Sequence, residues 1–225
     1  MNYHIDTGLI KEKFQTECAC PLCEIESVVT EQFLHEFLND AVMEDDTRLK
    51  VNKSGFCDKH FDMLITRQNK LSVALQISTR VDRLKKNMAP PKNYGEAKKQ
   101  AEELLKSQST CVICDLVDES MEKYYKTVAQ MYYKENDFYK ILLKTKGFCL
   151  KHYALLLKYG NYAYGDKNDY VSLLSKIQTA HVNSLSDDLN GFCLKHDYRN
   201  ALKPLGSAET ALPKMRNFLY GKKLK

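Results

Sequence analysis

Apolar side chains recur at helical spacing in two long stretches of this chain. In residues 22–43 the positions near a 3.6-residue period are Val28, Phe33, Phe37, Leu38 and Val42. In residues 113–133 the same period is carried largely by aromatic side chains, at Val117, Met121, Tyr124, Tyr125, Val128 and Tyr132. Polar and acidic residues separate these positions, so each stretch is predicted to form an amphipathic helix with one buried face.

Further helical segments follow each of these two stretches. The predicted segments are 45–52, 60–66 continuing into 69–87, 136–144, 152–159 and 168–189. Two prolines within residues 88–94 interrupt the helical pattern, and residues 95–107 are predicted to form a charged linker helix. We therefore expect an all-α protein with two modules, residues 1–88 and residues 95–225, the second with a C-terminal helical extension. The two modules either stand apart or pack as one globular unit.

Composition supports the helical prediction and limits the compartment. Glycine (9) and proline (5) are scarce, and 44% of residues are hydrophobic, as in an ordinary globular protein. The N-terminus lacks the basic start and apolar run of a signal peptide, and no apolar stretch approaches the length of a membrane span. We expect a cytoplasmic protein, in which eight cysteines indicate metal binding or thiol chemistry in place of disulfides.

Two copies of a cysteine and histidine pattern mark an internal repeat. Each copy joins a Cys-x-x-Cys pair to a later Gly-Phe-Cys-x-Lys-His element, with closely similar gaps in the two halves. The residues of the first copy are Cys20, Cys23, Cys57 and His60, and those of the second are Cys111, Cys114, Cys149 and His152. Duplication of one unit explains both copies.

Thiolate and imidazole ligands at this spacing predict zinc. Zinc prefers four tetrahedral ligands, and a two-residue gap lets both cysteines of a pair reach one ion. We expect one ion in each half, each closing a helical hairpin that leads away from the metal and returns to it. With all four positions filled by protein, both ions would be structural. A dithiol redox role is the alternative for the Cys-x-x-Cys pairs.

A third fragment repeats half of the pattern. Cys193 and His196 lie in another Gly-Phe-Cys-x-Lys-His element, but no Cys-x-x-Cys pair precedes it. Cys18 and His181 are the residues that could complete a site, although their spacing does not require it. We interpret the fragment as a degenerate repeat or a packing element in preference to a third zinc site.

Several segments together resemble an uncharacterised bacterial family of zinc-motif proteins. They are His4-Ile-Asp-Thr7, Cys20-Pro-Leu-Cys23, the two Gly-Phe-Cys-x-Lys-His elements and Lys195-His-Asp-Tyr-Arg199. The resemblance covers nearly the whole chain. It implies a mostly helical protein with paired metal modules. It also implies that residues 195–199 are a separate feature of the family, and it supplies no activity.

Three functions compete at this point. The leading hypothesis is a noncatalytic zinc-binding protein that binds another macromolecule, most favourably a protein, because the familiar catalytic motifs are absent from the sequence. The second hypothesis is nucleic-acid binding through basic residues, but the net charge of only +5 favours a solvated surface for them. These residues are Arg80, Arg83, Lys85, Lys86, Lys98, Lys99, Lys222, Lys223 and Lys225.

The third hypothesis is an enzyme that uses a thiol or a polar cluster. The candidate polar groups are Asp45, Asp46 and Arg48, or Asp197 and Arg199. Charged groups near a helix end are more often caps or surface ion pairs. The oligomeric state is left open by the sequence.

Overall fold

The computed structural model describes residues 5, 7–39, 44–195, 199 and 206–222, and every regular element in these ranges is helical. The prediction of an all-α protein is confirmed. Contacts divide the chain into two compact units, unit 1 (Met1–Ser27 with Met121–Leu224) and unit 2 (Val28–Ser120). None of the described helices is long and apolar enough to cross a membrane.

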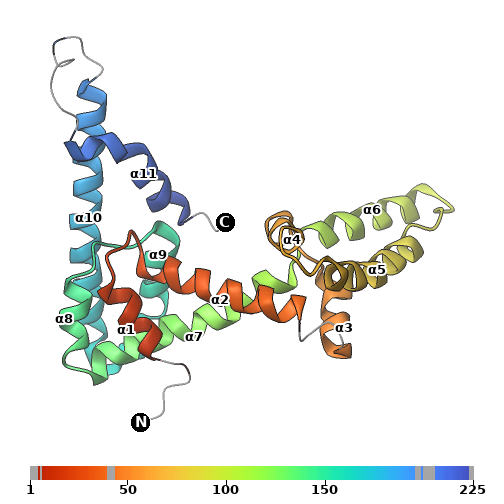
Figure 1. Cartoon of the computed structure of the whole chain (residues 1–225), viewed down its shortest axis with the longest axis horizontal. Coiled ribbons are helices and arrows are strands. Elements are labelled where there is room, and N and C mark those ends of the chain that lie inside the picture. Colours follow the sequence, from red (N-terminus) through yellow and green to blue (C-terminus); the bar gives the residue numbers. More distant parts are fainter. Residues whose placement is uncertain (1–4, 6, 40–43, 196–198, 200–205, 223–225) are drawn as a thin grey trace. The chain divides into compact units, whose positions relative to one another are not determined.

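The helices are distributed between the units as follows (Figure 1). Unit 1 contains α1 (Thr7–Gln15), α8 (Phe138–Leu143), α9 (Leu150–Lys158), η2 (Gly160–Asp166), α10 (Lys167–Lys195), η4 (Gly206–Thr210) and α11 (Ala211–Tyr220). Unit 2 contains α3 (Asp45–Ser54), α4 (Asp58–Ile65), α5 (Lys70–Asn87) and α6 (Tyr94–Gln108).

Two long helices contribute to both units. The division falls after Ser27 within α2 (Pro21–Leu38) and after Ser120 within α7 (Val112–Lys134). The units therefore interleave along the chain, unlike the consecutive modules 1–88 and 95–225 expected from the sequence. Each unit takes the start of one long helix and the end of the other.

The core of unit 1 is built around aromatic side chains. The ring of Phe14 in α1 lies 5.7 Å from that of Phe138 and 6.2 Å from that of Phe148. In α10, Tyr170, Leu174 and other buried residues recur at helical spacing and form its inner face. Apolar burial of this kind is the main stabilising contribution to a helical core.

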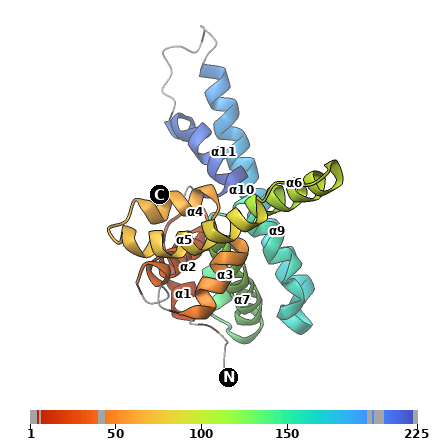
Figure 2. The ribbon, with the colours of Figure 1, turned by 90° about the vertical axis from the view of Figure 1, so that its right-hand side faces the viewer.

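In unit 1, α11 lies beside the second half of α10, as both views show (Figures 1 and 2). Asp188 of α10 accepts hydrogen bonds from Lys214 of α11 at 2.7 Å and from Ser207 at 2.5 Å. These bonds, led by that from Lys214, lower the pKa of the Asp188 carboxyl. The pairing anchors the start of α11 to α10.

The core of unit 2 joins the end of α2 to α5. The rings of Phe37 and Phe56 meet edge to face at 5.6 Å. Two side chains satisfy the last carbonyl groups of α2, because Asn69 donates to Leu38 O at 2.6 Å and Gln76 donates to Phe37 O at 2.5 Å. Asn69 also precedes α5, so the helix predicted to run on from residue 66 divides into α4 and α5.

Helix α6 confirms the charged linker helix predicted over 95–107. It buries none of its residues. Its start carries a reciprocal cap, in which the Asn93 side chain accepts from Glu96 N at 3.0 Å and the Glu96 carboxylate accepts from Lys92 N at 2.8 Å. Local capping, together with contacts from neighbouring loops, supports this helix in the absence of a buried face.

Candidate metal centres

The structure gathers cysteine and histidine side chains into two groups. Cluster A lies in unit 1 and consists of Cys20, Cys23, Cys149 and His152. Cluster B lies in unit 2 and consists of Cys57, His60, Cys111 and Cys114. In each cluster the four candidate ligand atoms lie within 4.8 Å of one another, so either cluster could hold a metal ion.

The pairing expected from the sequence is wrong. It joined each Cys-x-x-Cys to the Cys-x-x-His of the same half, whereas the structure exchanges them. The pair Cys20 and Cys23 meets the later Cys149 and His152, and the pair Cys111 and Cys114 meets the earlier Cys57 and His60. Each cluster therefore combines one motif from each copy of the repeat.

Helix lengths give the physical reason for the exchange. Helix α2 has 18 residues and is about 27 Å long, while α3, with 10 residues, spans only about 15 Å. Helix α7 has 23 residues, about 35 Å, and α8 has 6, about 9 Å. The short helices are too short to bring the Cys-x-x-His motif back to the start of the long helix before it.

All ligands lie at or near the starts of helices. Cys57 is the N-cap of α4 and Cys149 is the N-cap of α9, which places His60 and His152 in the first turns of these helices. The two Cys-x-x-Cys pairs occupy the starts of α2 and α7. The partial positive charge at a helix N-terminus favours the thiolate form that binds metal.

The distances match the edges of a tetrahedral site. Bonds of about 2.3 Å to sulfur and about 2.0 Å to nitrogen would separate two sulfurs by about 3.8 Å, and a sulfur from a nitrogen by about 3.5 Å. In cluster A the Cys23 and Cys149 sulfurs are 3.7 Å apart, and the three sulfurs lie 3.2–3.4 Å from His152 Nδ1.

Cluster B has nearly the same dimensions. The sulfurs of Cys57 and Cys114 are 3.8 Å apart, and the three sulfurs lie 3.3–3.5 Å from His60 Nδ1. A disulfide would need about 2.05 Å between sulfurs, and all eight cysteines are free. Both clusters therefore have the spacing of a metal site and not that of a disulfide.

A carboxylate supports the histidine of cluster A from outside. His152 presents Nδ1 to the sulfurs, and its Nε2 lies 3.4 Å from the Glu26 carboxylate, which also pairs with Lys151 at 2.8 Å. Burial raises the pKa of Glu26, but the nearby His152 ring and the hydrogen bond from Lys151 outweigh it and lower the pKa to about 2. A carboxylate on the outer nitrogen orients a metal-binding histidine and strengthens it as a ligand.

The electrostatics of cluster A favour a cation. Burial alone would lower the pKa of His152, yet hydrogen bonds with Cys149, Cys23 and Glu26 raise it to about 11. Hydrogen bonds from Cys20 and Cys23 lower the pKa of the Cys149 thiol despite burial. A thiolate at Cys149 that holds a proton on His152 this strongly forms a site where a metal ion would displace that proton.

The end of α11 reaches the sulfurs of cluster A. The backbone N–H of Lys222 lies 3.5 Å from Cys23 Sγ and is placed to donate to it. Gly221 is buried beside the cluster, since an added Cβ there would lie 3.4 Å from Cys23 Sγ and 3.8 Å from Cys149 Sγ. The Lys222 ammonium pairs with Glu24 at 2.6 Å.

Cluster B is more open than cluster A. Its Cys57 and Cys114 are only partly buried, whereas all four residues of cluster A are buried. A hydrogen bond from Cys114, with a further one from His60, lowers the pKa of Cys111 to about 3 against the effect of burial. Within the described residues, the contacts of His60 do not include a carboxylate placed as Glu26 is on His152.

The Gly-Phe-Cys turns position the second motif of each cluster. Gly55 has φ +66° and Gly147 has φ +145°, backbone conformations that side chains rarely adopt. Gly55 O accepts from Val112 N at 2.9 Å, which ties the turn to the start of α7. Gln178 exchanges two hydrogen bonds with the backbone of Phe148, at 3.0 and 3.1 Å, which fixes the other turn.

The structure does not add a third cluster in the residues it describes. Cys193 is exposed on α10, and His196 lies outside the described residues. Cys18 is partly buried and its thiol points at Lys13 O, 3.8 Å away. His181 packs its ring against Phe218 at 5.9 Å. Cys18, His181 and Cys193 do not join either metal-site group.

The other candidates have ordinary structural surroundings where they are described. Asp45 and Asp46 occupy the first turn of α3, and Arg48 pairs with Asp45 at 2.5 Å on its exposed side. Arg80 donates to the carbonyls of Asn52 and Ser107, each at 3.1 Å, and thus caps the ends of α3 and α6. Five further basic residues are exposed and do not contact either cluster, namely Arg83, Lys85, Lys86, Lys98 and Lys99. Asp197, Lys223 and Lys225 fall outside the described residues.

Sequence reasoning missed the groups around the ligands. Glu26 follows Cys23 by three residues on a helix, and this spacing could have suggested a role near the metal. The approach of Gly221 and Lys222 to cluster A had no sequence signal, because it depends on how α11 packs.

Comparison with known proteins places the chain in a family without adding an activity. Neither the curated proteins nor the solved structures include a match to it. The model of a family of unknown function, DUF6062, matches residues 1–225, and the chain belongs to this family.

Proposed function

We propose that this protein is a noncatalytic, zinc-stabilised helical protein that binds another protein. The observation that carries the proposal is the geometry of the two clusters, in which three sulfurs and one imidazole nitrogen stand at tetrahedral spacing. Each cluster would hold one zinc ion.

The ligand set favours zinc over other metals. Three thiolates with one imidazole are a common set for structural zinc, and tetrahedral sulfur-rich sites disfavour magnesium, calcium and manganese, which prefer oxygen. Four protein ligands also complete the coordination, so that no position is left for a substrate or water. This closure supports a structural role and not a catalytic one.

A protein partner is favoured by apolar side chains on the surface of unit 2. Leu71 and Leu75 lie one turn apart on α5, with exposures of 69% and 49%, and Leu105 of α6 is 67% exposed. Exposed apolar side chains at helical spacing suit the burial of a partner surface. Nucleic-acid binding has weaker support, because the guanidinium of Arg80 already donates hydrogen bonds to the carbonyl groups at two helix ends.

Metal analysis of the purified chain tests the first part of the proposal. Mass spectrometry of the acid-digested protein should give two zinc ions per chain. Chelation should then lower the unfolding temperature sharply, since structural zinc in small modules contributes an apparent ~10–16 kcal/mol. A folded, metal-free protein with reactive dithiols would overturn this part.

Capture from a host lysate tests the second part. The full chain should retain a specific protein, and a variant with Leu71→Glu and Leu75→Glu should lose it. Leu49→Glu is the matched control, because Leu49 is 65% exposed on α3, a different helix of the same unit. Equal capture by all three chains would contradict the assigned surface, and salt-sensitive retention on DNA or RNA would favour the nucleic-acid alternative.

A further inference from the structure

Cluster A has a fifth protein contact, made by the backbone that follows α11. Lys222 N lies 3.5 Å from Cys23 Sγ. At the neighbouring Gly221, an added Cβ would lie 3.4 Å from the same sulfur and 3.8 Å from that of Cys149. Gly221 adopts φ +76°, which turns the chain out of the helix and toward the cluster. The contact joins residues 199 positions apart in the sequence.

Two further interactions hold this segment in place. Arg216 of α11 donates to Gly221 O at 3.0 Å, from within the last turns of the same helix. Lys222 reaches Glu24, which lies next to Cys23 on α2, at 2.6 Å. The end of α11 is therefore built to meet the metal ligands, with its backbone amide as the group nearest to sulfur.

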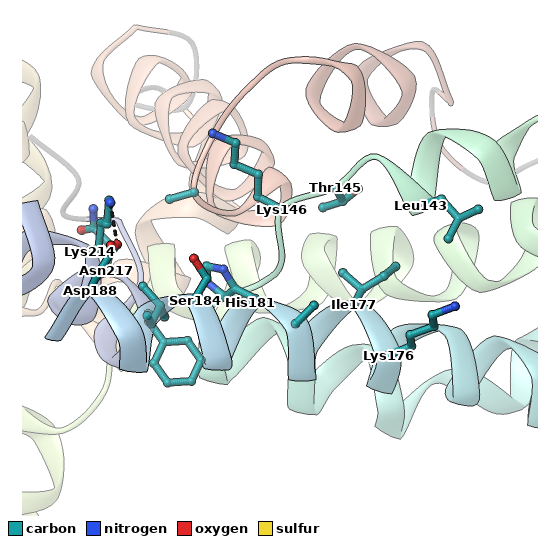
Figure 3. A pocket seen from close by; sticks show the side chains of 14 residues that line it. Leu143, Thr145, Lys146, Lys176, Ile177, His181, Ser184, Asp188, Lys214 and Asn217 are labelled. Carbon is teal, nitrogen blue, oxygen red and sulfur yellow. Dashed lines mark hydrogen bonds and ion pairs between the residues drawn. The ribbon is translucent and has the colours of Figure 1, made fainter. Parts of the chain in front are cut away.

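The position of α11 also defines a cleft in unit 1 (Figure 3). The cleft has a volume of about 570 Å³ and lies between α10, α11 and the loop after α8. Helix α10 supplies Ile177 and His181 to the cleft, while Lys214, Asn217 and Phe218 come from α11. Without α11 in place, this cleft would lack one wall.

We propose that the metal-loaded cluster A fixes α11 through the Lys222 N–H···Sγ hydrogen bond to Cys23 and thereby forms this cleft. The inference rests on the proposed function, because it needs zinc in cluster A. Bound zinc keeps Cys23 as a thiolate, and a negatively charged sulfur accepts a hydrogen bond more strongly than a neutral thiol does. Lys222 thus acts as a positioning residue for the metal site through its backbone.

The coupling works in both directions. If zinc stabilises the packing of α11 against cluster A, then this packing must by linkage strengthen the binding of zinc. Outer contacts of this kind commonly change metal affinity by about 10–100-fold. Cluster A should therefore release zinc more slowly when Lys222 N–H is present.

A matched pair of variants isolates the hydrogen bond. Lys222→Pro removes the N–H, whereas Lys222→Ala keeps it and removes only the ammonium that pairs with Glu24. The full-length variants are loaded with zinc, their metal content is measured, and release to a chromogenic chelator is followed. Hydrogen exchange of α11 and of α9 is recorded in the same samples.

We expect Lys222→Pro to release one of its two zinc ions about tenfold faster, with faster exchange in α11 and unchanged exchange in α9. Lys222→Ala should resemble the wild type. The proposal is overturned if the two variants behave alike, or if both ions are released faster. A wild-type chain without zinc would instead overturn the proposed function, which the initial metal content reveals separately.

A second pair of variants applies if Lys222→Pro does not fold. Gly221→Ala and Gly206→Ala both place a side chain at a positive φ, +76° and +55°, but Gly206 has no atom within 4 Å of the added Cβ. Only Gly221→Ala should hasten release of one zinc ion. Equal release from these two variants would also overturn the proposal.

Discussion

The two clusters have the same set of ligand types, three cysteines and one histidine, in different surroundings. In cluster A every ligand residue is at most 4% exposed, Glu26 faces the histidine, and Lys222 N–H approaches a sulfur. In cluster B the sulfurs of Cys57 and Cys114 belong to partly buried residues. The ligand set governs which metal is preferred, while the surroundings govern how firmly and how long the metal is held.

The exchanged pairing gives the largest expected effect, because losing a ligand removes an ion. Cys20→Ser combined with His152→Ala should leave one zinc ion per chain, since both changes fall in cluster A. Cys20→Ser combined with His60→Ala should leave none, since each cluster loses a ligand. Metal content per folded or partly folded chain, measured after gel filtration, checks both numbers.

Pairing within each half would reverse these two results. In that arrangement the first double variant would lose both ions and the second would keep one. Hydrogen exchange provides the control for folding. The first double variant should expose α9 of unit 1 while α4 of unit 2 stays protected, because the apparent zinc contribution of ~10–16 kcal/mol is lost only in unit 1.

The turns that carry Cys57 and Cys149 should differ in their tolerance of a side chain. A Cβ at Gly147 would lie 2.4–2.6 Å from Cβ, Cγ and Cδ2 of His181, atoms close to the backbone of α10. A Cβ at Gly55 would lie 2.5 Å from the end of the flexible Arg80 side chain. We expect Gly147→Ala to cost about 3 kcal/mol and Gly55→Ala about 2 kcal/mol in the free energy of unfolding.

Denaturant unfolding of the zinc-loaded variants measures both costs, with Gly206→Ala as a control for strain alone. A cost for Gly55→Ala that equals or exceeds that for Gly147→Ala would show that the Arg80 contact is the more rigid. The turn at Gly147 would then be the one that tolerates a side chain better.

Exposure predicts that cluster B loses its metal first. At a fixed chelator concentration we expect two phases of zinc release whose rates differ about tenfold. The faster phase should come from cluster B, because two of its ligand residues are partly exposed. Alkylation of the freed thiols, mapped by mass spectrometry, identifies the cluster. Modification of Cys149 before Cys57 would contradict the ranking.

Helices and ligand residues were largely predictable from the sequence. The 3.6-residue period marked α2 and α7, and the paired motifs picked out all eight residues that now form the two clusters. The short helices α3, α4, α8 and α9 were also predicted, but α1 and α11 were not delimited. Helix α1 has only Ile10 and Phe14 as buried residues, and α11 has only Ala211, so neither presents a long apolar period.

The pairing was harder to predict than the ligands, although the residue counts held a clue. At 1.5 Å per residue, the outgoing helix predicted over 22–43 is far longer than the return predicted over 45–52. A hairpin that returned to its own start was therefore disfavoured, because it would need the residues outside the short helix to be fully extended. The approach of Lys222 to Cys23 is different, because tertiary packing alone brings these residues together.

Replacing Glu26 gives the smallest effect and tests why cluster A is the tighter site. Glu26→Gln keeps the size of the side chain but removes the charge that faces His152 Nε2. We expect about tenfold weaker zinc binding at cluster A and no change at cluster B, measured by competition with a chelator of known affinity. Glu24→Gln, two residues away on α2 and paired with Lys222, is the matched control.

The pH dependence of this effect follows from the lowered pKa of Glu26. The folded value of about 2 lies below the ordinary value of 4.5, so the carboxylate contribution is complete above pH 4.5 and declines as the pH falls toward 2. The difference between wild type and Glu26→Gln should thus be constant from about pH 6 to 8. Equal zinc affinity of wild type and Glu26→Gln throughout this interval would mean that Glu26 does not support the histidine of cluster A.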